Sequence, residues 1–222
     1  MMDSVLPSRT LPITLRRQAP PVPGRQDTPE NWQEATEPAS LPLATTAVVV
    51  IDVWDRHWCA SATQGVAALV PNLNRFLEAA RRLDVPVIFA PSDVVDFYQE
   101  YPQRQAVLAI PTAPQPEPKP FDPPLPPWGI TGGCECGPER PCTTRMVWTR
   151  QHPDLYIAPQ DLIVNCNDNR ELWAVCQSRR LTHLVYAGVH ANMCVSYARS
   201  SSIRQMIRLG LECLLVRDLW SS

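Results

Sequence analysis

Two side chains suited to nucleophilic chemistry follow apolar segments that lie far apart in the sequence. Asp52 comes directly after the apolar run 47–51, and Cys194 comes shortly after Gly188. Burial raises the pKa of a carboxylate, so Asp52 is suited to take the proton of a thiol. Helix-end N–H groups would lower the pKa of Cys194 and hold the oxyanion formed when its sulfur attacks a carbonyl. The competing interpretations are a packing cysteine and an acid that caps the following turn.

The predicted secondary structure brings these two residues together. Strands are predicted at 47–51, 85–90, 162–164, 183–188 and 212–217, and helices at 64–83, 93–109, 170–180 and 191–209. This alternation predicts an α/β fold, a three-layer αβα sandwich with a mainly parallel, Rossmann-like central sheet. Parallel strands present their carboxyl ends at one edge of the sheet, and the sites of such folds lie at that edge.

The length and charge of the chain set broad limits. Its 222 residues suffice for one α/β domain. We expect an N-terminal arm over 1–43, with a short strand at 11–15, and one domain over 44–222 with a proline- and cysteine-rich insertion at about 111–144. A net charge of −2 gives no sign of the basic surface with which proteins bind nucleic acid, so no nucleic-acid partner is expected. No apolar run approaches the ~20 residues that span a membrane and no signal segment is found, so we expect a cytoplasmic protein.

Two segments carry a family resemblance. Residues 47–55 (AVVVIDVWD) and 188–195 (GVHANMCV) resemble the signature segments of the isochorismatase-like cysteine hydrolases, a superfamily that includes nicotinamidase and N-carbamoylsarcosine amidase. The similarity in strand and helix order covers about residues 45–218. The resemblance implies Cys194 as nucleophile and Asp52 as base in an amidase-type hydrolase that cleaves a C–N bond of a small-molecule, amide-like substrate. It also implies a homo-oligomer.

The resemblance further implies a non-proline cis peptide bond before the nucleophile, at Val189–His190. This bond would turn the backbone N–H groups of His190 or Ala191, together with that of Cys194, toward the oxyanion.

A substrate pocket is expected beside these residues. The side chains expected to line it are Trp54, His57, Trp58 and Asn165. The alternative for the tryptophans is packing in the core, and the alternative for the histidines is a structural role.

The sequence departs from the family pattern at its third catalytic residue, a lysine that follows the strand at 162–164. The residues there are Asn165, Cys166 and Asn167, and the only lysine of the chain is Lys119, in the proline-rich insertion. Either Lys119 reaches the site, or another cation substitutes, or the triad is incomplete. We favour substitution or loss over Lys119. The candidate substitutes are Arg145, Arg150 and His57.

The cysteines outside the predicted site form two groups. Three lie in apolar segments and are expected to be buried thiols, namely Cys166, Cys176 and Cys213. The spacing of Cys134, Cys136 and Cys142 fits a local disulfide or three free thiols. A metal site completed by His152 or His57 is the less favoured alternative, because zinc sites more often show C-x₂-C spacing.

Three functions remain open on the sequence. The first is the cysteine hydrolase, for which no cofactor is expected and no metal, because residues 91–97 lack the Asp-x-His segment of the nicotinamidase metal site. The second is an inactive superfamily member that binds a ligand or partner, since the lysine is missing and the helix usual after the last strand is absent. The third is a thiol-rich redox or metal-responsive protein, because of the cysteines at 134–142.

Overall fold

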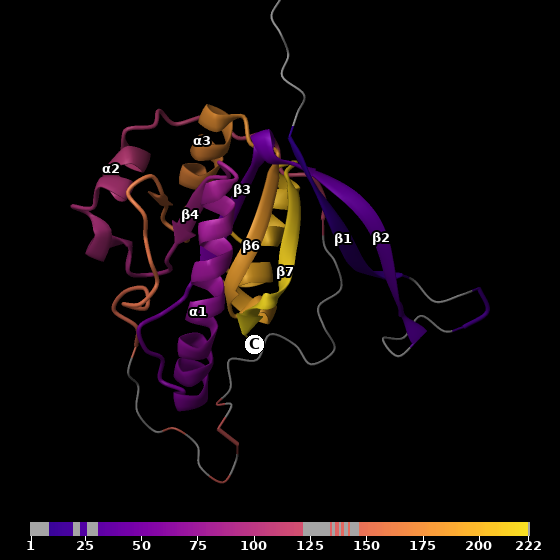
Figure 1. Ribbon diagram of the computed structural model, residues 1–222, viewed down its shortest axis with the longest axis horizontal. Helices are drawn as coiled ribbons and strands as arrows, with labels where there is room; N and C mark the ends of the chain where they lie inside the picture. The colour runs from indigo at the N-terminus through magenta and orange to yellow at the C-terminus, as the bar shows by residue number, and fades with distance from the viewer. Residues whose placement is uncertain are drawn as a thin grey trace, which may run out of the picture.

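The computed structural model describes residues 9–19, 23–25, 31–121, 134, 136, 137, 139, 142 and 147–221. Within them, five parallel strands form one sheet in the order β5-β4-β3-β6-β7. The strands are β3 (Thr46–Ile51), β4 (Val87–Ala90), β5 (Leu162–Ile163), β6 (His183–Val189) and β7 (Glu212–Ser221). The α-helices around them are α1 (Ala60–Arg82), α2 (Pro102–Leu108), α3 (Asn169–Arg179) and α4 (Ile203–Arg208). The predicted α/β sandwich is confirmed (Figure 1).

Each face of the sheet has its own apolar core. Val48 and Val50 of β3 pack with the apolar side of α1. Val49 and Ile51 pack on the opposite face, with residues of α3 and α4. Every residue of β3 is buried, as expected for a strand that is covered on both sides. Figure 1 shows α1 crossing the face of the sheet that is turned toward the viewer.

The strand order reverses between β3 and β6, and this reversal sets the place of the predicted site. The chain continues from β3 to β4 on one side and from β6 to β7 on the other. Ile51 and Gly188, near the ends of β3 and β6, are paired. A Cβ atom on Gly188 would lie 2.0 Å from the carbonyl oxygen of Ile51, so only glycine fits this approach. Asp52 and His190 extend from this point, where ligands bind in such sheets.

The helix predicted at 191–209 is broken into two pieces. Residues Ala191–Ala198 form a π-helix (η4), and α4 follows after a gap. Arg199 in the gap has extended backbone angles, φ −113° and ψ 156°. Three serines follow it, and serine side chains favour turns and caps over helix interiors. The helix predicted at 93–109 is likewise split, into a 3-10 turn (η3, Val95–Tyr98) and α2.

The N-terminal arm contains more β structure than predicted. The strand expected at 11–15 belongs to β1 (Thr10–Ala19), which pairs antiparallel with β2 (Gln33–Pro42). A 3-10 turn (η2, Leu43–Thr45) then leads into β3. The sequence did not reveal β2 because it contains Pro38, and proline lacks the N–H donor of a regular strand residue.

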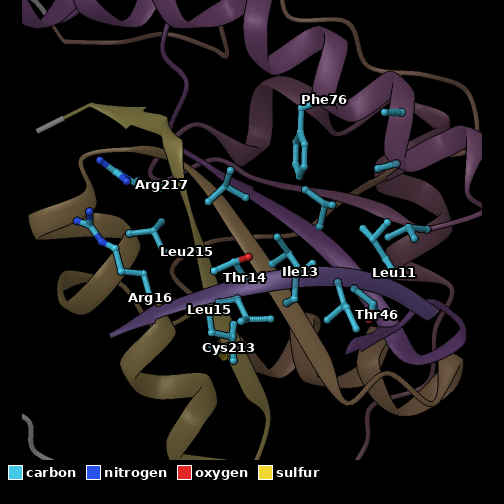
Figure 2. Close-up of a pocket in the computed structure, with 18 of the residues that line it drawn as sticks. Leu11, Ile13, Thr14, Leu15, Arg16, Thr46, Phe76, Cys213, Leu215 and Arg217 are labelled. Carbon is cyan, nitrogen blue, oxygen red and sulfur yellow. The ribbon is translucent and has the colours of Figure 1, made fainter. Parts of the chain in front are cut away.

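A cavity of about 980 Å³ lies between this hairpin, α1 and the sheet. Figure 2 shows Leu11 and Ile13 of β1 on one side of it, with Phe76 of α1 and Leu215 of β7 across from them. The residues that line it include neither Asp52 nor Cys194. This cavity is therefore separate from the candidate active site.

Candidate active site

Asp52 follows β3 and is held by a residue that follows β4. The side chain is almost fully buried, with 1% of the residue exposed. The backbone N–H of Ser92 donates to Asp52 Oδ1 at 2.7 Å, and the Ser92 hydroxyl donates to Oδ2 at 2.8 Å. Burial raises the pKa of Asp52 to about 6, although hydrogen bonds from Ser92 and interactions with Cys194 and Arg199 act to lower it. The predicted rise in the pKa is confirmed, and Asp52 is mostly ionised at pH 7.

Cys194 faces Asp52 from η4. Its side chain lies within hydrogen-bonding reach of the Asp52 carboxylate and of the Arg199 guanidinium. The expectation that the helix end lowers the pKa of this thiol is wrong. Burial and then the negative charge of Asp52 raise the pKa of Cys194 to about 12, and Arg199 offsets this only in part. At neutral pH the pair is therefore a thiol beside a carboxylate, and a thiolate forms only as the proton leaves the sulfur.

The turn from β6 into η4 positions Cys194. The peptide bond between Val189 and His190 is cis, as the family resemblance implied. The carbonyl of His190 accepts hydrogen bonds from the N–H groups of Met193 and Val195, both at 3.1 Å. Both sequence neighbours of Cys194 are thus tied to the end of the turn, and this holds the sulfur at the edge of the sheet beside Asp52.

The cation beside this pair is Arg199, which is not among the cations predicted from the sequence. Its Nη2 donates to Asp93 Oδ2 at 2.9 Å, and its Nη1 donates to Asn167 Oδ1 at 3.2 Å. Burial acts to lower the pKa of Arg199, but the neighbouring Cys194 and Asp52 outweigh it and raise the pKa. Arg199 therefore places a fixed positive charge next to the thiol and the carboxylate.

None of the cations predicted from the sequence takes this place in the described part of the chain. The backbone N–H of Lys119 donates at 2.8 Å to the carbonyl of Arg208, and its ammonium group lies near Gly210, before the start of β7. The guanidinium of Arg150 lies over a phenylalanine ring, 5.6 Å from its centroid. Burial, with a further effect of a neighbouring histidine, lowers the pKa of His57 to about 4, so this ring is neutral at pH 7. Arg145 lies outside the described residues.

Cys166 is one of the three residues after β5 among which the resemblance calls for a lysine. It is fully buried after β5. Its thiol interacts with Ser92 and lies near Asp52 and Cys194. Burial, and then the charge of Asp52, raise the pKa of Cys166 well above its usual value, so the thiol stays neutral. Positive charge therefore reaches the pair from Arg199 rather than from the residue after β5.

Four aromatic side chains pack together at this edge of the sheet, and we name them the aromatic wall: Trp54, His57, Trp148 and His190. Trp54 stacks on His57 and on Trp148, with ring centroids 4.8 and 5.1 Å apart, and meets His190 edge-on at 5.1 Å. Trp58 contacts only the His57 ring of this wall, at 5.1 Å. The structure thus brings together the three predicted pocket residues of this segment and adds Trp148.

Asn165, the fourth predicted pocket residue, lies in the loop after β5. Its backbone N–H donates to the carboxylate of Glu171 at 2.7 Å, and its Oδ1 accepts from the N–H of Asn167 at 3.0 Å. Glu171 is fixed in turn by Arg104 at 2.8 Å. Asn167 is the member of this loop whose side chain reaches Arg199.

Three residues near the pair were missed from the sequence, Ser92, Trp148 and Arg199. Ser92 gave a signal, because it follows the strand predicted at 85–90 and so had to lie at the same edge as Asp52. Trp148 follows the insertion, where no periodic pattern indicates a position. Its Nε1 donates to the Ser92 carbonyl at 3.1 Å, which ties the aromatic wall to the residue that holds Asp52.

The predicted metal ligands are gathered differently from the expectation. The three cysteines in the segment 134–142 come together with Cys59 as the fourth member. His152, expected as the fourth ligand, instead accepts a hydrogen bond at Nδ1 from the N–H of Asp154 at 3.2 Å. His57 likewise accepts one at Nδ1 from the N–H of Cys59 at 3.1 Å. Neither histidine belongs to the group, and its fourth sulfur is that of Cys59, which precedes α1.

Comparison with known proteins gives structural likenesses only. No protein-family model matches the chain, and no curated protein matches it. It is similar to an isochorismatase from Pseudomonas putida, with 18% identity and a TM-score of 0.47 over 80% of this chain and 71% of that one. An isochorismatase family protein from Burkholderia thailandensis is 21% identical, with a TM-score of 0.46 over 80% and 79% of the two chains. A cysteine hydrolase from Pseudomonas syringae pv. phaseolicola is 18% identical, with a TM-score of 0.46 over 81% and 73%.

Proposed function

We propose that this protein is an isochorismatase-like cysteine hydrolase that cleaves a C–N bond of a small amide-like substrate. The observation that carries the proposal is the group of a buried thiol, a buried carboxylate and a half-buried guanidinium, formed by Cys194, Asp52 and Arg199 where the strand order reverses. These are the groups that acyl transfer needs: a nucleophile, a base for its proton, and a positive charge for the oxygen that becomes negative.

In the first half of the reaction, Asp52 acts as the base. Its pKa of about 6 leaves it as a carboxylate at pH 7, while Cys194, with a pKa of about 12, remains a thiol. The proton therefore passes to Asp52 as the sulfur bonds to the carbonyl carbon, and not before. The carbonyl oxygen becomes an oxyanion, which Arg199 and the backbone N–H groups of His190, Ala191 or Cys194 stabilise.

The second half releases both products. When the tetrahedral intermediate collapses, the C–N bond breaks and protonated Asp52 gives its proton to the leaving nitrogen. A thioester then links the acyl group to Cys194. Asp52 takes a proton from a water molecule that attacks the thioester, the C–S bond breaks, and the sulfur regains the proton from Asp52. The enzyme returns to its starting state, with one water consumed.

The aromatic wall favours a small, flat substrate. Trp54, His57 and Trp148 stack nearly parallel to one another, with interplanar angles of 7 to 22°, and of the three His57 and Trp148 are partly exposed. Parallel rings stack on planar groups such as an amide or an aromatic acyl group. The neutral His57 adds hydrogen-bonding capacity to this wall without adding charge. We therefore propose an uncharged planar amide as the substrate class.

A second function, ligand binding without turnover, is favoured by Cys166. This residue leaves no positive charge after β5, and the pKa of Cys194 lies well above that of a free thiol. In this alternative the aromatic wall still binds a planar ligand, but the sulfur never attacks it. The hydrolase requires that Arg199 alone supplies the positive charge needed for catalysis, whereas the binding function does not.

Hydrolysis of a panel of small amides, with aromatic and aliphatic acyl groups, separates the two functions. The proposal predicts acid and amine products from at least one amide, with turnover abolished in Cys194→Ala. Cys213→Ala, which removes a half-buried thiol on β7, is the matched control and keeps its activity. Amides that bind in a thermal-shift assay but yield no product with any variant would refute the hydrolase and support the binding function.

The chemistry of the nucleophile also bears on the proposed cellular setting. In the described part of the chain, no helix has the length and apolar character needed to cross a bilayer. We propose the cytoplasm, because Cys194 must stay reduced to act and thiols persist in reducing compartments. We also propose self-association, which light scattering of the purified chain tests directly.

A further inference from the structure

Four cysteines from two distant parts of the chain form a cluster outside the candidate active site. We call Cys59, Cys134, Cys136 and Cys142 the four-cysteine cluster, and their sulfur atoms all lie within 4.8 Å of one another. Cys59 is the N-cap residue of α1, and the other three come from the insertion between α2 and β5. All four are free thiols, so the structure contains no disulfide among them.

The spacing of the sulfurs matches a tetrahedron around one metal ion. The Sγ atom of Cys59 lies 3.8 Å from that of Cys136 and 3.9 Å from that of Cys134, and Cys136 and Cys142 are 3.5 Å apart. Zinc binds thiolates tetrahedrally at ~2.3 Å, which places neighbouring sulfurs about 3.8 Å apart. A disulfide would need a separation of ~2.05 Å. The three measured edges therefore fit a common metal and no pairwise bond.

Hydrogen-bond donors surround the sulfurs as they do around metal-bound thiolates. The N–H of Ala60 donates to Cys142 Sγ at 3.3 Å, and the N–H of Cys142 donates to Cys134 Sγ at 3.3 Å. The Ser61 hydroxyl lies 3.1 Å from Cys136 Sγ. Two of these donors belong to the first turn of α1, where the partial positive charge of the helix also favours anionic sulfur. The surroundings are thus arranged for negative charge on the cluster.

We propose that the four-cysteine cluster binds one zinc ion as a structural site. Four thiolates complete the tetrahedral shell, so no coordination position is left for water or substrate, as in zinc sites that stabilise a fold. Tetrahedral coordination by four sulfurs selects zinc, or iron, over metals that prefer oxygen ligands. The site is independent of whether Cys194 is a working nucleophile, because Cys194 is not one of its ligands.

The position of the cluster gives the metal a structural role near the active site. Zinc would tie the insertion to the start of α1, immediately after the segment that carries Trp54 and His57. Cys59 and His57 are already linked by the hydrogen bond from the Cys59 N–H to His57 Nδ1 at 3.1 Å. The metal therefore fixes one end of the loop that forms the aromatic wall.

The metal content of the full chain tests the proposal. The protein is purified under reducing conditions without chelators, and metals are measured by inductively coupled plasma mass spectrometry. We expect one zinc per chain, falling below about one tenth in Cys136→Ser and Cys142→Ser. Cys213→Ser, the matched control outside the cluster, keeps one zinc per chain. Circular dichroism of each variant identifies any loss of zinc that follows from global unfolding.

Measurements on the unaltered chain keep the test decisive even if a variant fails to fold. After exchange with cobalt(II), we expect the intense visible absorption of a tetrahedral thiolate site, with one cobalt bound per chain. An unaltered chain that takes up neither zinc nor cobalt while reduced would overturn the proposal. So would stoichiometric iron in place of zinc, or a disulfide between two cluster cysteines found by peptide mapping of freshly purified protein.

Discussion

Replacing Asp52 with asparagine removes the proposed catalytic base and, with it, the destabilisation of the fold that a buried carboxylate causes. Asparagine keeps the shape of the side chain, accepts the left-handed backbone of this position (φ 50°), and still hydrogen-bonds Ser92. It cannot ionise. Because burial raises the pKa of Asp52, the folded state holds the proton more tightly than the unfolded state does. Ionised Asp52 therefore destabilises the fold, and Asp52→Asn should remove that penalty.

The size of the penalty follows from the shift in the pKa. A change from 3.8 to about 6 corresponds to about 3 kcal/mol of unfolding free energy once the group is fully ionised in both states. While its raised pKa keeps Asp52 protonated, the carboxyl contributes to the stability of the fold. This contribution is fully present below pH 3.8 and is lost as the pH rises through 6. About 2 kcal/mol of the loss falls between pH 4 and pH 7. His57, with its lowered pKa, changes stability in the opposite sense in this window.

Urea denaturation of the wild type and Asp52→Asn at several pH values between 4 and 8 measures the effect. Groups that both proteins share, including His57, contribute equally to the two free energies of unfolding. Their contributions therefore cancel in the difference. We expect this difference to move in favour of the variant by about 2 kcal/mol from pH 4 to pH 7, while hydrolysis is lost. Parallel stability curves over this range would refute the raised pKa of Asp52, and with it the assignment of a buried base.

Three further predictions concern the cation, the base and the sheet. Arg199→Gln should lower kcat/KM by ~100-fold or more while leaving the fold intact in circular dichroism, as expected when a group that stabilises the oxyanion is removed; an unchanged kcat/KM contradicts the role. The kcat/KM of the wild type should rise with pH through about 6, where Asp52 loses its proton, and a pH-independent rate would exclude this base. Gly188→Ala should destabilise the fold by about 3 kcal/mol or more in urea denaturation, because its Cβ would lie 2.0 Å from the Ile51 carbonyl oxygen. Gly210→Ala is the matched control, since it also has a positive φ but no contact closer than 3.8 Å, and equal losses in the two variants would contradict a steric cause.

The sequence revealed the residues whose position depends only on the sheet. Asp52 and Cys194 follow buried strands, and the carboxyl ends of parallel strands meet at one edge whatever the loops do. Buried thiols could be predicted in the same way for Cys166 and Cys176, which lie in the core, whereas Cys213 is only half-buried. Strand periodicity is local, so a single sequence is enough to detect it.

Arg199 could not be found by the same reasoning. A continuous α-helix advances ~100° per residue, which places a residue five positions after Cys194 about 140° around the helix from it. The π-helix and the break at the serines change that geometry and let Arg199 turn back to the sulfur. The four-cysteine cluster was hidden for another reason, since Cys59 lies 75 residues before Cys134 and only tertiary structure joins them.

The central claim is that Cys194 forms an acyl-enzyme, and intact-protein mass spectrometry tests it most directly. Once an amide substrate is identified, the enzyme is mixed with it and quenched in acid during turnover, and the mass is compared with that of Cys194→Ala treated in the same way. We predict a mass increase equal to the acyl group, located on Cys194 by peptide mapping and absent from the variant. Hydrolysis that continues at an undiminished rate in Cys194→Ala would contradict the account.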